Sequence, residues 1–153
     1  MTLANHRIRP AQLERFMRES LHIEGIEREP TFEELNATAA FLRLSVLTVS
    51  AVEELVSVYA PRHRLRDAIG LDVRVGPYIA PRGCPEIRDR LADILQQIGE
   101  LDAWEIHCRY EVLHPFTDGN GRSGRAIWLW QMDGIAPLGF LHMFYYQTLQ
   151  HQR

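Results

Sequence analysis

The polar side chains best suited to chemistry lie in one short segment, HPFTDGNGRSGR, at residues 114–125. Gly119 and Gly121 allow the backbone to approach a ligand closely, immediately before a predicted helix. The unpaired N–H groups and the positive dipole end of that helix would face the ligand, and Asn120 adds an amide donor. The segment therefore predicts a binding site for an anion such as phosphate.

Charged residues in the same segment extend this prediction. Arg122 and Arg125 are three residues apart, so they share one helical face and can bind further phosphate oxygens. Asp118 supplies a single hard carboxylate, which suits Mg²⁺ because this ion usually takes one or two carboxylates and completes its shell with phosphate and water. Together these residues predict a site for a nucleotide di- or triphosphate with Mg²⁺.

His114 is the candidate general base of this site. Its neighbour Pro115 disfavours helical geometry at the preceding residue, so the helix before the segment should end at His114. An unperturbed imidazole has a pKa of about 6.5, which allows the neutral ring to accept a proton near physiological pH. Outside the segment, His107 is expected to be hydrogen-bonded within the fold, and the remaining histidines are expected to be ordinary surface or core residues: His6, His22, His63, His142 and His151.

The elements around the site are predicted to be mainly α, because apolar residues recur at helical spacing. The first helix covers about residues 10–23 and ends before Gly25, a residue suited to a helix C-terminus. A capping box at Thr31 and Glu34 opens a second helix. We extend that helix to Pro61, because no Gly or Pro interrupts it, although its valines favour strands.

A small β-hairpin and four more helices complete the predicted order. Val73 and Val75 alternate with charged neighbours, and Gly76 with Pro77 supplies a turn, so residues 72–80 are predicted to form the hairpin. The further helices are expected at about residues 85–99, 101–113, 122–132 and 138–150.

Length and composition limit the classes of protein to consider. The chain has 153 residues and a net charge of −3, so a single domain over residues 1–153 is expected, and the slightly acidic balance argues against nucleic-acid binding. No apolar run approaches the roughly 20 residues of a membrane span. The two cysteines, Cys84 and Cys108, suit a reducing compartment. We therefore expect a soluble cytoplasmic protein, and the sequence leaves homo-oligomerisation open.

The segment at residues 114–125 matches the Fic motif, HxFx(D/E)GNGRxxR, at every defined position, so the chain resembles the Fic family. This resemblance implies a helical Fic fold and transfer of AMP from ATP to a Ser, Thr or Tyr hydroxyl of a target protein. It implies that His114 activates the hydroxyl, that Asp118 holds Mg²⁺, and that Phe116 anchors the loop in the core. Residues 119–122 would hold the α and β phosphates, and Arg125 would meet the γ-phosphate.

Two details of the resemblance concern the type of transfer and the target. The related Doc toxins phosphorylate their target and carry a lysine where this chain has Gly121, so Gly121 favours nucleotidyl transfer. The hairpin at residues 72–80 resembles the Fic flap, which pairs with an extended segment of the target by strand addition. In that interpretation Val73, Arg74 and Val75 belong to the docking strand.

Residues 20–25 read SLHIEG and fit the Fic inhibitory pattern (S/T)xxxE(G/N), with Ser20 and Glu24 at its defined positions. Their place before the core resembles the class whose inhibitory helix is N-terminal, here residues 10–25. The resemblance implies that Glu24 pairs with Arg125 and turns it away from the γ-phosphate. One guanidinium cannot be fully paired with a carboxylate and a phosphate at once.

Two other functions use the same residues and stay open at this point. With Glu24 positioning a water, the protein would be a phosphodiesterase that removes AMP from a modified protein. Alternatively, the chain is a non-catalytic nucleotide-binding module in which the motif survives without a working target groove.

Overall fold

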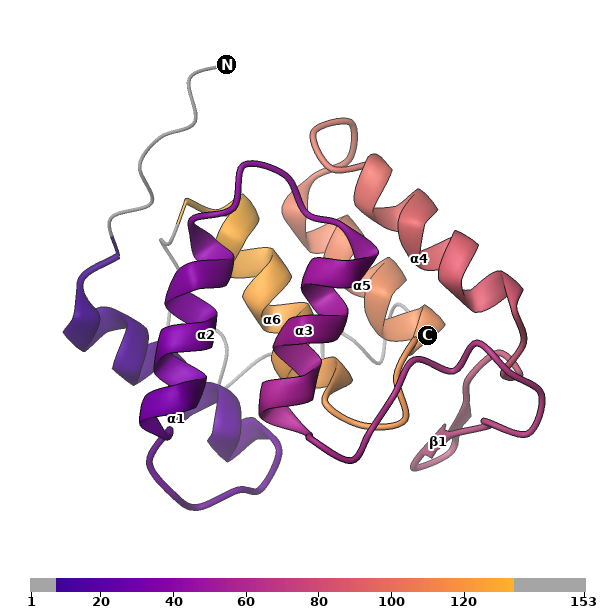
Figure 1. The fold of residues 1–153 in the computed structure, drawn as a ribbon, viewed down its shortest axis with the longest axis horizontal. Coiled ribbons are helices and arrows are strands. Elements are labelled where there is room, and N and C mark those ends of the chain that lie inside the picture. The colour runs from indigo at the N-terminus through magenta and orange to yellow at the C-terminus, as the bar shows by residue number, and fades with distance from the viewer. Residues whose placement is uncertain (1–7, 134–153) are drawn as a thin grey trace.

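The computed structural model describes residues 8–133, and within them the chain is mainly helical (Figure 1). The elements in chain order are α1 (Pro10–Ile23), α2 (Phe32–Leu42), α3 (Val49–Tyr59), β1 (Arg74–Val75), β2 (Tyr78–Ile79), α4 (Glu86–Gln96), α5 (Ala103–Leu113) and α6 (Asn120–Gln131). The predicted fold class, mainly α with a small hairpin, is confirmed for this part of the chain. The helix expected at residues 138–150 lies outside the described residues.

Helix α6 occupies the centre of the bundle and packs against α1, α2, α3 and α5. Because neighbours surround it, most of the helix is buried, and Ile127 and Leu129 have no exposed surface. Phe16 of α1 and Val52 of α3 belong to the same core cluster. The start of α6 and the end of α1 both reach the lower side of the molecule in Figure 1, so the fold brings the inhibitory pattern next to the motif.

The single helix predicted from Thr31 to Pro61 is wrong, because the chain turns back over residues 43–48 between α2 and α3. The overlooked signal is Thr48, whose Oγ1 accepts the N–H of Ala51 at 3.1 Å and caps α3. The two helices lie side by side in opposite directions (Figure 1), and both contact α6. Folding back buries both apolar faces, whereas one long helix would carry part of that surface away from the core.

The hairpin is present where the sequence predicts it, with β1 and β2 antiparallel and Val75 opposite Tyr78. Gly76 in the turn has a φ of 55°, which glycine adopts without strain. The Tyr78 hydroxyl donates to the Val112 carbonyl in the last turn of α5. The hairpin therefore lies beside the end of the helix that leads to His114.

Helices α5 and α6 flank the motif. The Asp102 side chain caps the start of α5, and this helix ends at Leu113, as Pro115 predicts. Helix α6 begins at Asn120 rather than at Arg122, so the glycine-rich stretch forms the first turn instead of a preceding loop.

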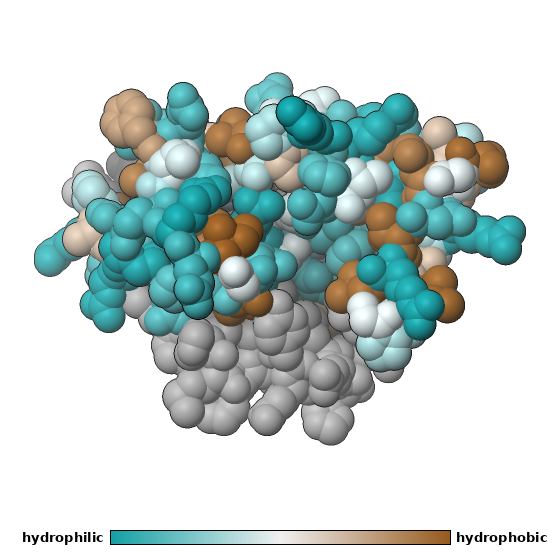
Figure 2. Space-filling model, turned by 90° about the horizontal axis from the view of Figure 1, so that it is seen from below, coloured by the Kyte–Doolittle hydropathy of each residue, from teal (hydrophilic) through white to brown (hydrophobic). Residues whose placement is uncertain are grey.

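The lower side of the molecule, which carries the end of α1 and the loop before α6, is seen face-on in Figure 2. Hydrophilic residues cover most of the described surface there, and hydrophobic residues form small, separated patches. Across residues 8–133, none of the helices combines the length and the apolar character needed to cross a bilayer. The loop before α6 therefore lies on a mainly polar face.

The capping box predicted at Thr31 and Glu34 is confirmed and forms part of a larger polar cluster. The Oγ1 of Thr31 accepts the N–H of Glu34 at 3.1 Å, and Oε2 of Glu34 accepts the N–H of Thr31 at 2.8 Å. Arg28 donates to both Glu34 oxygens, at 3.0 and 2.7 Å. Burial raises the pKa of Glu34, but the hydrogen bonds from Arg28 and Thr31 outweigh it and leave the pKa below its usual range. The cluster ties the loop after α1 to α2.

We expect Glu34→Gln to lower the free energy of unfolding by about 1 kcal/mol at pH 7, because the amide loses the charge-assisted bonds from Arg28. A carboxyl with a lowered folded pKa stabilises the protein above its unfolded pKa of about 4.3, and this stabilisation is lost as the pH falls through the folded value. Urea unfolding between pH 7 and pH 3 should therefore show that the free energies of unfolding of wild type and Glu34→Gln converge at low pH. Glu33→Gln, at an exposed neighbour, is the control, and a gap that did not depend on pH would contradict the prediction.

Candidate active site

His114 ends α5 in the left-handed conformation, with a φ of 51°. Its N–H donates to the Tyr110 carbonyl at 2.9 Å, which completes the last turn of the helix. Its own carbonyl accepts the Nε–H of Arg66 at 2.7 Å. A residue other than glycine keeps this conformation only where its surroundings fix it. The backbone of the predicted base is therefore held from both sides.

Asn120 closes the loop before α6. Its Oδ1 accepts the N–H of Phe116 at 2.8 Å, and its Nδ2 donates to the Phe116 carbonyl at 2.7 Å. Phe116 is buried. Both polar atoms of the Asn120 amide thus bond to the Phe116 backbone and shape the loop. The predicted contact between Asn120 and phosphate stays a prediction.

Arg125 is fully buried and takes acceptors from α1 and its C-terminal cap. Its Nε–H donates to the Ser20 hydroxyl at 2.8 Å, and Nη2 donates to the Ser20 carbonyl at 3.0 Å. Nη2 also donates to Oε1 of Glu24 at 2.6 Å. The contact between Glu24 and Arg125 that the resemblance implied is therefore present.

The Glu24 carboxylate also lies against the first turn of α6. A Cβ atom placed on Gly121 would come within 2.0 Å of Oε1 of Glu24, so any side chain there would displace the carboxylate. The positive end of the helix dipole stabilises an anion at this place. An anion of the protein itself thus occupies the position predicted for phosphate.

Arg122 is held by α3. Its Nη1 donates to the Tyr59 carbonyl at 2.8 Å, and the guanidinium lies 5.7 Å from the centre of the Tyr59 ring. Burial raises the pKa of Tyr59 to about 12, so the ring stays neutral. The two guanidinium groups are thus bonded to different helices, Arg122 to α3 and Arg125 to α1, and their joint binding of phosphate stays a prediction.

Asp118, the predicted metal ligand, has 57% of its side chain exposed. Its Oδ1 accepts the N–H of Gly119 at 2.7 Å, and its Oδ2 lies 3.6 Å from Nε2 of His63. Over the described part of the chain, no three His, Cys, Asp or Glu side chains gather into a metal site. The Asp118 carboxylate therefore fits an ion such as Mg²⁺, which takes few ligands from the protein and its remaining ligands from phosphate and water.

A comparison with known families decides what kind of protein carries this site. Residues 47–132 match the model of the Fic/DOC family, and this span contains the hairpin and the whole segment at residues 114–125. The chain belongs to the Fic/DOC family. Membership suggests AMPylation or a related nucleotidyl transfer to proteins, with ATP as substrate and generally with a metal ion. No curated protein matches the chain.

The Fic/DOC match begins at residue 47, so α1 lies before it. Ser20 and Glu24 are therefore outside the matched span. Any role of these two residues has to be argued from their contacts with Arg125 and Gly121.

Sequence reasoning missed Arg66, which joins the Fic/DOC motif to the hairpin. Its side chain has no exposed surface, and burial lowers its pKa while the nearby Asp72 opposes that shift. The guanidinium donates at 2.7–3.0 Å to four backbone carbonyls, those of Leu71, Pro81, Leu113 and His114. No sequence pattern could have indicated this role, because the acceptors are backbone carbonyls and three of them lie 15 to 48 residues from Arg66.

The segment that carries Arg66 is also paired with the motif through the backbone. The N–H of Arg66 donates to the Pro115 carbonyl at 2.8 Å, and the N–H of Thr117 donates to the Arg64 carbonyl at 3.0 Å. These bonds frame an isolated antiparallel bridge between residues 65 and 116. The segment before the hairpin therefore braces the loop that carries the predicted site.

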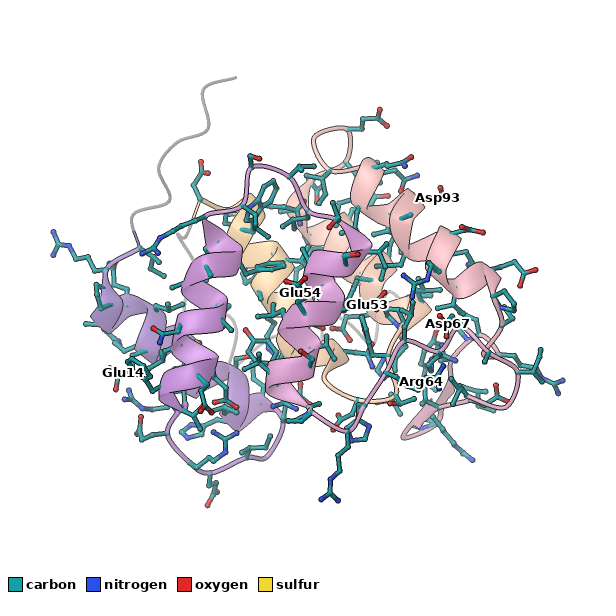
Figure 3. The ribbon with its side chains drawn as sticks, viewed as in Figure 1. Glu14, Glu53, Glu54, Arg64, Asp67 and Asp93 are labelled. Atoms are coloured by element: carbon teal, nitrogen blue, oxygen red, sulfur yellow. The ribbon has the colours of Figure 1, made fainter. Side chains whose placement is uncertain are left out.

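Ion pairs on the surface connect the segment that carries Arg66 to α3 and α4. Figure 3 shows Glu53 on α3 near Arg64 and Asp67 of the segment that follows it. Arg88 of α4 bonds to Glu53 at 2.5 Å and to Asp67 at 3.3 Å. Exposed pairs of this kind contribute only about 0–1 kcal/mol each. The buried guanidinium and the backbone bridge are therefore the main supports.

Replacing Arg66 with Met should lower the free energy of unfolding by about 3 kcal/mol or more, because four carbonyls lose their donor. Arg66→Lys should lower the free energy of unfolding by a smaller amount, since its ammonium keeps some of the bonds but cannot reach all four acceptors. Arg64→Met is the matched control, because the Arg64 side chain is exposed and bonds only weakly to Asp67. Urea denaturation measures all three variants, and equal losses for Arg66→Met and Arg64→Met would contradict the linking role.

Proposed function

We propose that this chain is a protein adenylyltransferase that moves AMP from ATP to a Ser, Thr or Tyr hydroxyl and is held inactive by Glu24. Residues 10–25 act as the inhibitory helix and residues 72–80 as the flap. The observation that carries the proposal is the place of the Glu24 carboxylate, which bonds to Arg125 and lies against Gly121 at the start of α6. Because the start of α6 and Arg125 stabilise the Glu24 carboxylate, they can also stabilise a phosphate group.

In the proposed reaction, the neutral imidazole of His114 takes the proton from the target hydroxyl, whose oxygen attacks the α-phosphorus of ATP. The new P–O bond forms as the bond to the β-phosphate breaks, and pyrophosphate leaves. The bonds from Tyr110 and Arg66 support this role, because they fix the backbone from which the imidazole projects. Gly121, in the place of the Doc lysine, supports nucleotidyl rather than phosphoryl transfer.

The phosphate groups would be shared between the backbone of the first turn of α6 and two arginines. Arg125 meets the γ-phosphate once Glu24 has moved away. Arg122 uses one of its five N–H donors on Tyr59 and adds others to the phosphates. Asp118 holds Mg²⁺, which when bound neutralises phosphate charge. Asn120 keeps the loop in shape.

The target protein would dock on the hairpin. Within residues 8–133, β1 and β2 pair only with each other, so an outer edge can accept a further strand. Arg74 and Ile79 are exposed, whereas Val73 and Val75 are half-buried. Because Tyr78 ties the hairpin to the end of α5, a docked strand would lie near His114.

Removing the inhibitory carboxylate is the direct test. We expect Glu24→Gly to raise AMP transfer by about 10- to 100-fold, since a charge-assisted hydrogen bond contributes roughly 1.5–3 kcal/mol. The measurement is incorporation of label from α-labelled ATP with Mg²⁺ into a cell lysate and into the protein itself. Glu27→Gly, an exposed glutamate in the same loop, is the matched control and should leave transfer unchanged.

The second variant tests the chemistry rather than the inhibition. Adding His114→Ala to Glu24→Gly should abolish labelling, because no base remains to activate the hydroxyl. Transfer that survived this double change would remove His114 from the mechanism. Equal transfer by wild type and Glu24→Gly would remove the inhibitory role of Glu24.

The same materials separate the two alternative functions. If wild type releases AMP from protein labelled by Glu24→Gly, the chain is a phosphodiesterase that uses Glu24. If calorimetry shows ATP–Mg²⁺ binding to both proteins but neither transfers label, the chain is a nucleotide-binding module.

A further inference from the structure

His63 lies beside Asp118, although the sequence gives it no special role. Its Nε2 is 3.6 Å from Oδ2 of Asp118, and its Nδ1 is 3.0 Å from Oγ1 of Thr117. The His63 side chain is 40% exposed, so a small ion can reach the space between the imidazole and the carboxylate.

The backbone fixes the relative position of these groups. The N–H of His63 donates to the Ala60 carbonyl at 3.0 Å, and the N–H of Arg64 donates to Oγ1 of Thr117 at 3.1 Å. The N–H of Thr117 returns a bond to the Arg64 carbonyl. His63 and Asp118 therefore face each other across two segments that are already hydrogen-bonded together.

The separation of 3.6 Å is too long for a hydrogen bond between imidazole and carboxylate. In the tautomer whose Nδ1–H donates to Thr117, the lone pair of Nε2 faces Oδ2 of Asp118, and both atoms can bind one cation. Two donor atoms at this separation can both lie about 2.1 Å from one divalent cation. The hydrogen bond to Thr117 is of the kind that orients a metal-binding histidine.

We infer that Nε2 of His63 and Oδ2 of Asp118 are two ligands of one divalent cation, and that the imidazole makes this site prefer transition-metal ions to Mg²⁺. Mg²⁺ favours oxygen ligands, whereas the divalent transition metals, from Mn²⁺ onward, also bind sites that contain nitrogen ligands. Phosphate and water oxygens complete the shell. The inference deepens the proposed function, because Asp118 is its metal ligand, but its test does not depend on transfer.

The test uses Mn²⁺ as probe and inorganic triphosphate, which contains no nitrogen, with the full chain carrying Glu24→Gly. Pulsed EPR of bound Mn²⁺ should show coupling to a histidine nitrogen. The coupling should disappear in Glu24→Gly/His63→Gln and persist with His22→Gln, a change at an exposed histidine of α1. Titration of the free Mn²⁺ signal should show a loss of affinity of at least about tenfold for the His63 variant. The affinity for Mg²⁺ should change less.

Three outcomes would overturn the inference: no nitrogen coupling in the parent, coupling that survives His63→Gln, or no binding of Mn²⁺. Asp118→Asn provides a second variant and should also weaken Mn²⁺ binding. Nitrogen coupling without AMP transfer would support the metal site and count against the proposed function. Transfer without nitrogen coupling would support the proposed function and count against the metal site.

Discussion

A buried guanidinium must find acceptors inside the protein, and Arg125 imposes this requirement on the whole site. In this structure Ser20 and Glu24 supply those acceptors from α1 and its C-terminal cap. A nucleotide phosphate could satisfy the same donors, but not while the carboxylate holds them. Activity would then follow from a competition between two anions for one cation at the centre of the fold.

The packing around α6 places the Glu24 carboxylate where a phosphate would also bind. Gly121 lets the Glu24 carboxylate approach the helix backbone, where a phosphate would also be stabilised. Phe16 and Leu21 anchor α1 in the core, whereas Glu24 stands at its C-terminal cap with 31% of its side chain exposed. The competing anion thus belongs to a residue that is more exposed than those that anchor α1, so its movement would not require the helix to undock.

Much of the site was predictable because its signals are local. The motif spacing located His114 and Asp118, and Pro115 fixed the end of α5 through its effect on the preceding residue. The hairpin turn at Gly76 likewise follows from a short pattern. The break between α2 and α3 was missed, because a cap at Thr48 competes weakly with a long run of helical spacing.

By itself, the sequence determined which side chains could meet phosphate, metal and proton, since residue type and spacing set that chemistry. Only the tertiary structure decided how those groups are used. It directed Arg122 to the Tyr59 carbonyl and placed Arg66 between the hairpin and His114. The reason is physical: buried polar groups must be satisfied by whatever the fold brings near them, and those partners are backbone atoms distant along the chain.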